Sequence, residues 1–339
     1  MKQFALTVLF LVGVLVLSFL VFGVPLGEGA KLLAEGAFGD KVAVSQSVVR
    51  ATPVLLTAIG ITVAWRAGAF NIGGEGQLLI GALFAATVGK AILNSGLGFA
   101  GCLLMLLAAA IGGAVWSGLA AVLYLKRGVD LVISTILLNF IGDKLLLYFI
   151  EGPIRKAGQT APLTDQIPDA MMLPKFSRQS DLHLGIFFAL VVALAVGYWM
   201  FRTKSGYFAR IVGANPRFAR VNRIDADRVK FRAMILSGAI CGLAGGIQFL
   251  GINGQLASSF SQQYGFLGIP VALVGALNPF AVIPSALFFG GLFAATSNLS
   301  RFGGIGNYFV YVIQAGTVIG LLLFRAVSER RIAAKGEAA

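Results

Sequence analysis

Apolar runs of roughly 20 residues, the length of helix that crosses a bilayer, follow one another along almost the whole chain. Apolar residues make up 58% of the sequence and charged residues only 12%. Ordinary soluble domains carry about 25% charged residues. These features exclude a water-soluble globular enzyme. They predict an all-α protein that is a polytopic membrane helical bundle.

We expect about ten transmembrane helices within one transmembrane domain, residues 1–339. Because the number is even, both termini should lie on the same side of the membrane. The first run follows Lys2 like a signal peptide, but no small-x-small cleavage site follows it, so it is expected to be a retained helix. The predicted spans are residues 4–24, 51–66, 72–93, 98–124, 131–150, 183–201, 230–251, 266–277, 280–298 and 305–326.

The distribution of Lys and Arg predicts the orientation of these spans. With the N-terminus inside, seventeen of these residues lie on the cytoplasmic side and nine outside, which is the direction of the positive-inside rule. Residues 152–182 then form an external loop, and residues 202–229 form a cytoplasmic segment. The net charge of +13 therefore reflects membrane topology, and no nucleic-acid partner is expected.

Residues that could carry chemistry are sparse. Cys102 and Cys241 lie inside apolar runs, and His183, the only histidine, lies at an expected helix end. This set predicts no disulfide, no metal site and no cofactor. No phosphate-binding loop and no nucleophile–base pair can be found, so no catalytic residue is expected and the chain should lack an ATPase site of its own.

Three interruptions break the apolar runs, at residues 71–76, at Asn278-Pro279 and at residues 303–306. Irregular backbone at membrane depth is tolerated only where protein or water satisfies its polar groups. Interruptions at matching places in two halves indicate a transport pathway in folds with inverted repeats. We therefore expect broken helices, and an internal inverted repeat as one way to arrange them.

The first interruption carries four polar side chains, Arg66, Asn71, Glu75 and Gln77. Glu75 is placed near a helix start, where the helix dipole favours a carboxylate, and it could pair with Arg66. Either these groups hold a turn together, or they line or gate a polar pathway. Asn139 is a further candidate, because polar groups inside a span are functional candidates by default.

A second motif runs from Gly213 to Ile224 in the cytoplasmic segment. Asn215 can cap a short helix whose first residue is Pro216. Phe218, Val221 and Ile224 then fall on one side of it. A basic surface loop would account for the arginines alone, but an apolar stripe flanked by arginines favours docking into the groove of a partner protein.

These motifs, together with Ser134–Asn139, Tyr264–Gly275 and Asn278-Pro279, resemble the nucleoside-type branch of ABC importer permeases, within the ribose and branched-chain amino acid permease superfamily. The resemblance covers about residues 50–326. It implies a pathway formed by two permease subunits, often different chains. It also implies two cytoplasmic ATPase subunits and an external substrate-binding protein, either a lipoprotein or a periplasmic protein.

The resemblance implies roles for two groups of residues. Relatives commonly have glycine where this chain has Arg223, so the exit of the short cytoplasmic helix is a departure from the pattern. Pathway candidates are Asn71, Glu75, Gln77 and Asn139. The coupling helix that docks on the ATPase would comprise Gly213, Asn215, Pro216, Arg217, Phe218, Arg220 and Arg223.

The expected function is a permease subunit of an ATP-driven importer in the inner membrane of a bacterium, surrounded by lipid, with both termini cytoplasmic. Nucleosides are the leading substrate class by resemblance, with simple sugars and riboflavin-like compounds as alternatives. A different class, an ion-coupled secondary transporter, would use Glu75 or Asp143 as its coupling group. The residues alone do not identify the substrate.

Overall fold

The computed structural model describes residues 25–177 and 180–302, with a few isolated positions outside these ranges. A 3-10 turn, η1 (Asp169–Met171), precedes a two-stranded antiparallel hairpin of β1 (Lys175–Ser177) and β2 (Ser180–His183). A five-residue π-helix, η2 (Phe249–Asn253), directly follows the helix α10 (Ala226–Gln248). The α-helices are α2 (Leu26–Phe38), α3 (Lys41–Arg66), α4 (Gly74–Ala91), α5 (Phe99–Arg127), α6 (Leu131–Glu151), α7 (Gly185–Arg202), α8 (Lys204–Ala214), α9 (Pro216–Val221), α10 (Ala226–Gln248), α11 (Tyr264–Val274) and α12 (Pro279–Phe302).

Six helices in the described ranges are long and apolar enough to cross a membrane: α3, α5, α6, α7, α10 and α12. The predicted span 72–93 corresponds to α4, which has 18 residues, and the predicted span 266–277 corresponds to α11, which has 11 residues. The first and last predicted spans fall almost wholly outside the described residues. A multi-pass helical membrane protein is therefore confirmed, whereas the number ten stays a prediction.

The chain divides into two compact units, one of residues 51–287 and one that contains the described residues up to 50 and from 288 onward. In the second of these, the Ser47 hydroxyl donates to the carbonyl of Ala37 at 3.1 Å, and the Arg50 guanidinium lies 4.8 Å from the ring centre of Phe293. The candidate functional groups all lie in the unit of residues 51–287.

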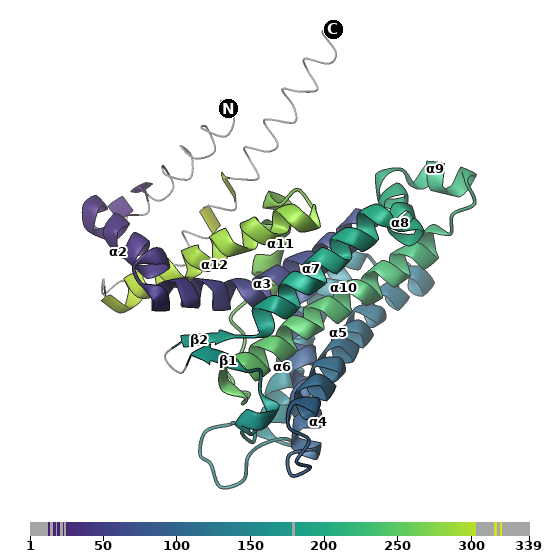
Figure 1. The fold of residues 1–339 in the computed structure, drawn as a ribbon. Helices are drawn as coiled ribbons and strands as arrows, with labels where there is room; N and C mark the ends of the chain where they lie inside the picture. Colours follow the sequence, from purple (N-terminus) through teal and green to yellow (C-terminus); the bar gives the residue numbers. More distant parts are fainter. Residues whose placement is uncertain are drawn as a thin grey trace. The chain divides into compact units, whose positions relative to one another are not determined.

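Helices α4, α5 and α10 pack together in this unit through glycines. A Cβ atom at Gly113 of α5 would collide with the carbonyl of Gly238 on α10, and one at Gly81 of α4 would collide with the carbonyl of Gly242. Small residues let membrane helices approach until their backbones touch. In Figure 1 α5 and α10 run side by side, with α8 and α9 at one end and the β1–β2 hairpin towards the other.

Gly113→Ala should lower the thermal stability of the purified protein by several degrees. The new methyl group meets backbone that cannot move without separating α5 from α10, and overpacking typically costs about 1–3 kcal/mol. Gly118→Ala on the same helix is the matched control, because there the nearest atom is the flexible end of Ile235, at 2.9 Å. Thermal unfolding in one detergent compares the two variants. Equal melting temperatures would contradict this close packing.

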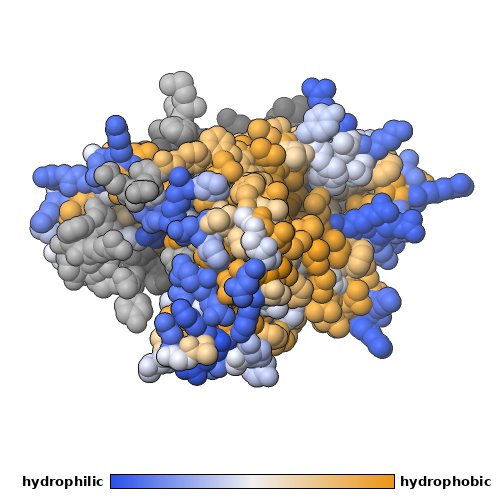
Figure 2. Space-filling view, turned by 60° about the horizontal axis from the view of Figure 1, so that its bottom comes forward, coloured by the Kyte–Doolittle hydropathy of each residue, from blue (hydrophilic) through white to orange (hydrophobic). Residues whose placement is uncertain are grey.

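The outer surfaces of the long helices are apolar. Leu107 of α5, Phe140 of α6 and Val191 of α7 are all more than half exposed. Figure 2 shows hydrophobic side chains as a continuous zone over the middle of one face, with hydrophilic side chains beside it. Such a surface is stable only against lipid or another membrane subunit.

Two of the predicted interruptions are confirmed. α3 ends at Arg66 and α4 begins at Gly74, while α11 ends at Val274 and α12 begins at Pro279. An asparagine stands in each break. The Asn71 side-chain oxygen accepts from the amide of Gly73 at 2.9 Å, and that of Asn278 accepts from the amide of Phe280 at 3.1 Å. The third predicted interruption, at residues 303–306, lies outside the described residues.

Candidate functional site

Asn71 lies at the centre of a buried polar cluster in the break between α3 and α4. Its amide nitrogen donates to the side-chain oxygen of Gln77 at 3.0 Å and to the Ser237 hydroxyl of α10 at 2.9 Å. The Gln77 amide donates back to the Asn71 oxygen at 2.9 Å. Asn71 is fully buried, and Gln77 is 1% exposed. These amides therefore bond to one another and to α10.

Asn139 joins the same break to the middle of α6. Its side-chain oxygen accepts from the amide of Gly76 at 2.8 Å, and its amide donates to the carbonyl of Ile72 at 3.0 Å. Gly76 packs so closely on α6 that a Cβ atom there would lie 2.9 Å from the Asn139 Cα atom. Asn139 thereby satisfies backbone groups that the break would otherwise leave unpaired inside the membrane.

Glu75 fastens the first turn of α4 to the start of α11. One carboxyl oxygen accepts from the Ser261 hydroxyl at 2.6 Å, and the other accepts from the amide of Gly265 at 2.7 Å. The side chain is buried. Both of its oxygens are thus used within the protein.

All four pathway candidates, Asn71, Glu75, Gln77 and Asn139, therefore lie around one break. They bring α4, α6, α10 and α11 to a common point. The sequence placed Asn71, Glu75 and Gln77 at this break, but it predicted neither the contact of Asn139 with the break nor the bonds between Asn71 and Gln77. Whether they border a pathway stays a prediction.

The pair of Arg66 and Glu75 that the sequence left possible is not formed. The Arg66 side chain donates to the carbonyl of Leu277 at 2.8 Å and to that of Ala276 at 3.1 Å. Ala276 and Leu277 both have a φ of +53°, which is uncommon for residues other than glycine and presents their carbonyls to the guanidinium. Arg66 thus holds the second break in the chain, and Glu75 points to α11 instead.

The cytoplasmic segment predicted from the sequence contains two short helices, α8 and α9. Asn215 caps α9 as expected, since its side-chain oxygen accepts from the amides of Arg217 and Phe218 at 3.1 and 3.0 Å, and Pro216 is the first helical residue. Phe218 is 50% exposed and Val221 is 82% exposed. Among the residues that the structure describes, none covers Phe218 and Val221 on the apolar side of α9.

The chain leaves α9 through Arg223, which has a φ of +56°. This is the left-handed conformation that favours glycine. The turn therefore has the backbone conformation typical of glycine, although the residue is an arginine. Arg223→Gly should raise the stability of the protein by about 1 kcal/mol, because glycine adopts this conformation without strain. Chemical denaturation would show it. Arg220→Gly, inside α9, is the control and should be destabilising.

α8 also contacts the first break. Gly213 lies against the carbonyl of Arg66, so closely that a Cβ atom there would collide with it. The residue that holds Ala276 and Leu277 is therefore in direct backbone contact with the segment that carries α9. A displacement of α8 would act on both breaks, because packed backbone transmits movement without yielding.

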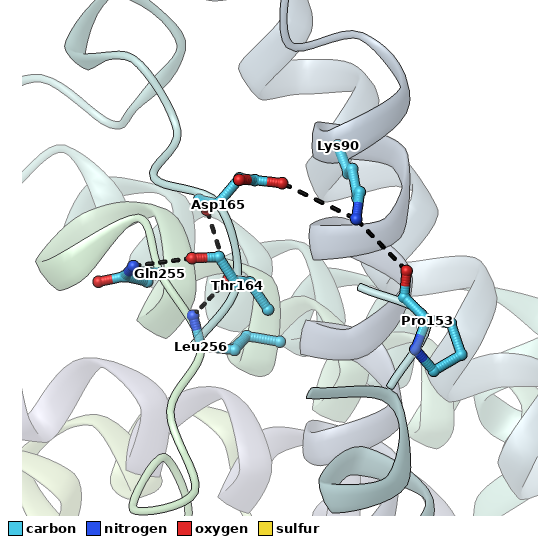
Figure 3. A network of polar contacts seen from close by, with 6 residues as sticks. All are labelled: Lys90, Pro153, Thr164, Asp165, Gln255 and Leu256. Atoms are coloured by element: carbon cyan, nitrogen blue, oxygen red, sulfur yellow. Dashed lines mark hydrogen bonds and ion pairs between the residues drawn. The ribbon is translucent and has the colours of Figure 1, made fainter. Parts of the chain in front are cut away.

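The loop between α6 and α7 is bonded, around Thr164, to the chain that follows η2, as Figure 3 shows. The Thr164 hydroxyl accepts from the amide of Leu256 at 2.9 Å, and the Gln255 amide donates to the Thr164 carbonyl at 2.7 Å. Lys90, in the last turn of α4, donates to the carbonyl of Pro153 at 3.3 Å and lies 3.9 Å from Asp165. The sequence predicted a loop here, but not its partners.

His183 ends this loop and is buried, although the sequence indicated an ordinary helix-boundary residue. Its Nδ1 atom accepts from the amide of Gly185 at 3.0 Å, and its ring packs on Gly251 of η2. Burial lowers the pKa of His183 to about 4, with Lys175 acting in the same direction and Asp181 against it. The imidazole is therefore neutral at physiological pH and serves as a packing group.

Within the described ranges, no three His, Cys, Asp or Glu residues come together as a metal site. Asp143, the alternative coupling group, forms an ion pair with the neighbouring Lys144 at 3.2 Å on a partly exposed part of α6. What the geometry offers is a set of broken helices held by polar groups, and a short helix, α9, with exposed apolar side chains.

Residues 43–327 match the family described as "Branched-chain amino acid transport system / permease component". The chain belongs to this family. Its members are membrane subunits that carry solute, so the chain is a transport component. A glucose ABC transporter permease, TsgB13 of Haloferax volcanii, is 32% identical over 82% of this chain and 75% of its own length. The guanosine ABC transporter permeases NupP and NupQ of Bacillus subtilis are each 30% identical, over 88% and 83% of this chain and 86% and 90% of their own lengths.

Proposed function

We propose that this permease carries nucleosides into the cell in an ATP-driven importer, with a second, different permease chain beside it. The observation that supports this best is the similarity to NupP and NupQ, two guanosine permeases of one organism. Two nucleoside permeases of Lactococcus lactis, NupB and NupC, are also similar, at 27% and 29% identity. Similarity to both members of such pairs favours a heterodimeric pathway.

The ATPase subunits would bind at α9. Its exposed Phe218 and Val221 lie on a segment rich in arginine, which suits a groove that is apolar at its centre and acidic at its rim. Closure of the ATPase pair would move α8 and α9. Gly213 would pass that movement to Arg66 and so to both breaks, as a shift between packed states.

The orientation follows from the charges. With α9 in the cytoplasm, both termini are cytoplasmic and the loop of residues 152–182 faces outward, where a substrate-binding protein would deliver solute. The membrane would be the inner membrane of a bacterium. The four pathway candidates would border the pathway and hold the backbone of the broken helices in place. They are Asn71, Glu75, Gln77 and Asn139.

Sugars are the second substrate candidate, because TsgB13, a glucose permease, is 32% identical to this chain. Riboflavin is a third, through a probable riboflavin import permease of Treponema pallidum that is 25% identical. Import of radiolabelled guanosine by cells expressing the complete transporter tests the proposal. We expect uptake that unlabelled uridine or adenosine suppresses and glucose or riboflavin does not. No uptake of guanosine, together with uptake of radiolabelled glucose by the same cells, would assign the sugar function instead.

A further inference from the structure

Residues 257–263 connect η2 to α11 without forming a helix, and both ends of this segment are fixed. At one end Leu256 is bonded to Thr164 beside the last turn of α4 (Figure 3). At the other end Ser261 is bonded to Glu75 in the first turn of α4. The segment therefore links chain that is bonded to the loop of residues 152–182 with chain that is bonded to the first turn of α4.

The end of this segment next to α11 packs against the middle of α3, a helix long and apolar enough to cross a membrane. The carbonyl of Tyr264, the first residue of α11, accepts from the Thr57 hydroxyl at 3.1 Å, and Thr57 belongs to the stretch 51–64 of α3, where every residue is buried. A Cβ atom at Gly268 would lie 2.6 Å from the Thr57 hydroxyl. Irregular backbone is stable inside a membrane only where it is buried in protein or lines a water-filled cavity.

Four side chains of this segment are exposed: Ser258, Ser259, Gln262 and Gln263. Polar groups of this kind facing hydrocarbon would be costly, so we infer that these side chains face water in the assembled transporter. Gln263 also has a φ of +59°, and the Gln262 side-chain oxygen accepts from the Tyr264 hydroxyl at 2.7 Å. The backbone of this surface is thus held in a fixed, unusual shape.

No charged residue occurs between Gly254 and Pro279. The surface consequently offers hydroxyl and amide groups, which both donate and accept hydrogen bonds. Phe266, which is 37% exposed, adds an aromatic ring close by in the chain. This combination fits an uncharged, hydroxyl-bearing solute with a flat or apolar face.

From this placement we propose that Ser258, Ser259, Gln262 and Gln263 form the polar wall of the translocation pathway and contact a neutral, hydrogen-bonding solute. The proposal rests on the proposed transport function and adds the residues that meet the solute. Glu75 and Thr164 act as positioning residues, because they fix the two ends of the segment. The wall needs only weak contacts, since a solute that is bound tightly would not be released.

Cysteine labelling in the assembled transporter tests this wall. Ser258→Cys and Ser259→Cys change one atom each, and the native Cys102 and Cys241 are fully buried, so they contribute little background. Leu107→Cys on α5 is the matched control, because Leu107 is 58% exposed on an apolar surface. With a charged, membrane-impermeant thiosulfonate, we expect the two serine positions to react roughly tenfold faster than the control, because only they face water.

Solute protection is the second readout. Guanosine, glucose and riboflavin are tested one at a time at saturating concentration, and we expect at least one to slow the labelling severalfold, while zwitterionic leucine does not. Labelling of Ser259→Cys as slow as that of Leu107→Cys would overturn the wall, and fast labelling that no neutral solute slows would overturn the contact. The proposed transport function is tested separately, by ATP-driven uptake with the wild-type transporter. If the wild type takes up solute, either labelling result above overturns the wall or its contact with solute and leaves the transport function intact. If the wild type takes up no solute, that result counts against the transport function.

Discussion

Arg220→Glu combined with Arg223→Glu should abolish both ATPase association and solute uptake, while the amount of permease in the membrane stays normal. Both arginines are exposed on and just after α9, which is the proposed docking helix. Reversing two charges turns an attraction to an acidic rim into a repulsion, and like charges across an interface suppress binding strongly. Co-purification with the ATPase and uptake of labelled solute measure the two effects.

The matched control is Lys126→Glu with Arg127→Glu. These residues are exposed at the end of α5 and are predicted to lie on the same side of the membrane, so the change in charge is equal but lies outside α8 and α9. We expect the control to keep most of its ATPase binding. Unchanged uptake in the Arg220 and Arg223 variant would remove the docking assignment, and equal loss in both variants would attribute the effect to membrane-surface charge in general.

Glu75→Ala should reduce uptake by about tenfold or more while the protein still inserts. The substitution removes both hydrogen bonds that fasten α11 to α4 and leaves the amide of Gly265 without a buried partner. Each such bond to a charged group contributes about 1.5–3 kcal/mol, and tenfold corresponds to about 1.4 kcal/mol. Uptake normalised to the amount of permease in the membrane gives the effect.

Glu75→Gln separates fastening from charge. A glutamine can still accept from Gly265 and bond to Ser261, so we expect it to retain most of the uptake. Loss with glutamine as severe as with alanine would show that the carboxylate charge itself is needed, as an ion-coupled mechanism would require. Glu151→Ala, at the exposed end of α6, controls for loss of a carboxylate elsewhere and should have little effect.

Local sequence patterns predicted the features that depend on neighbouring residues. The capped start of α9 is one such feature, because Asn215 and Pro216 act within one turn. The two described breaks are another, because glycine, asparagine and proline interrupt helices wherever they are packed. Asn71, Glu75 and Gln77 were found as candidates because they lie in or beside the first of these breaks.

Contacts between distant segments could not be predicted in this way. Glu75 is bonded to Ser261, 186 positions away in the chain, and Arg66 to Leu277, 211 positions away. Spacing along one helix carries no information about such partners. Residues 257–263 gave no signal either, because a polar segment between two apolar runs normally indicates a connection outside the membrane. The proposal that this segment lines the pathway depends on its bond to Glu75 and on the bond of α11 to Thr57, which only the structure shows.

The source of energy is the central question, and transport by sealed vesicles tests it most directly. The vesicles would contain this permease, its partner permease and the ATPase, with the loaded binding protein outside and ATP trapped inside. With proton and sodium gradients collapsed by ionophores, we expect solute to accumulate with ATP and not with a non-hydrolysable analogue. Accumulation that follows an ion gradient and proceeds without ATP would contradict the assignment.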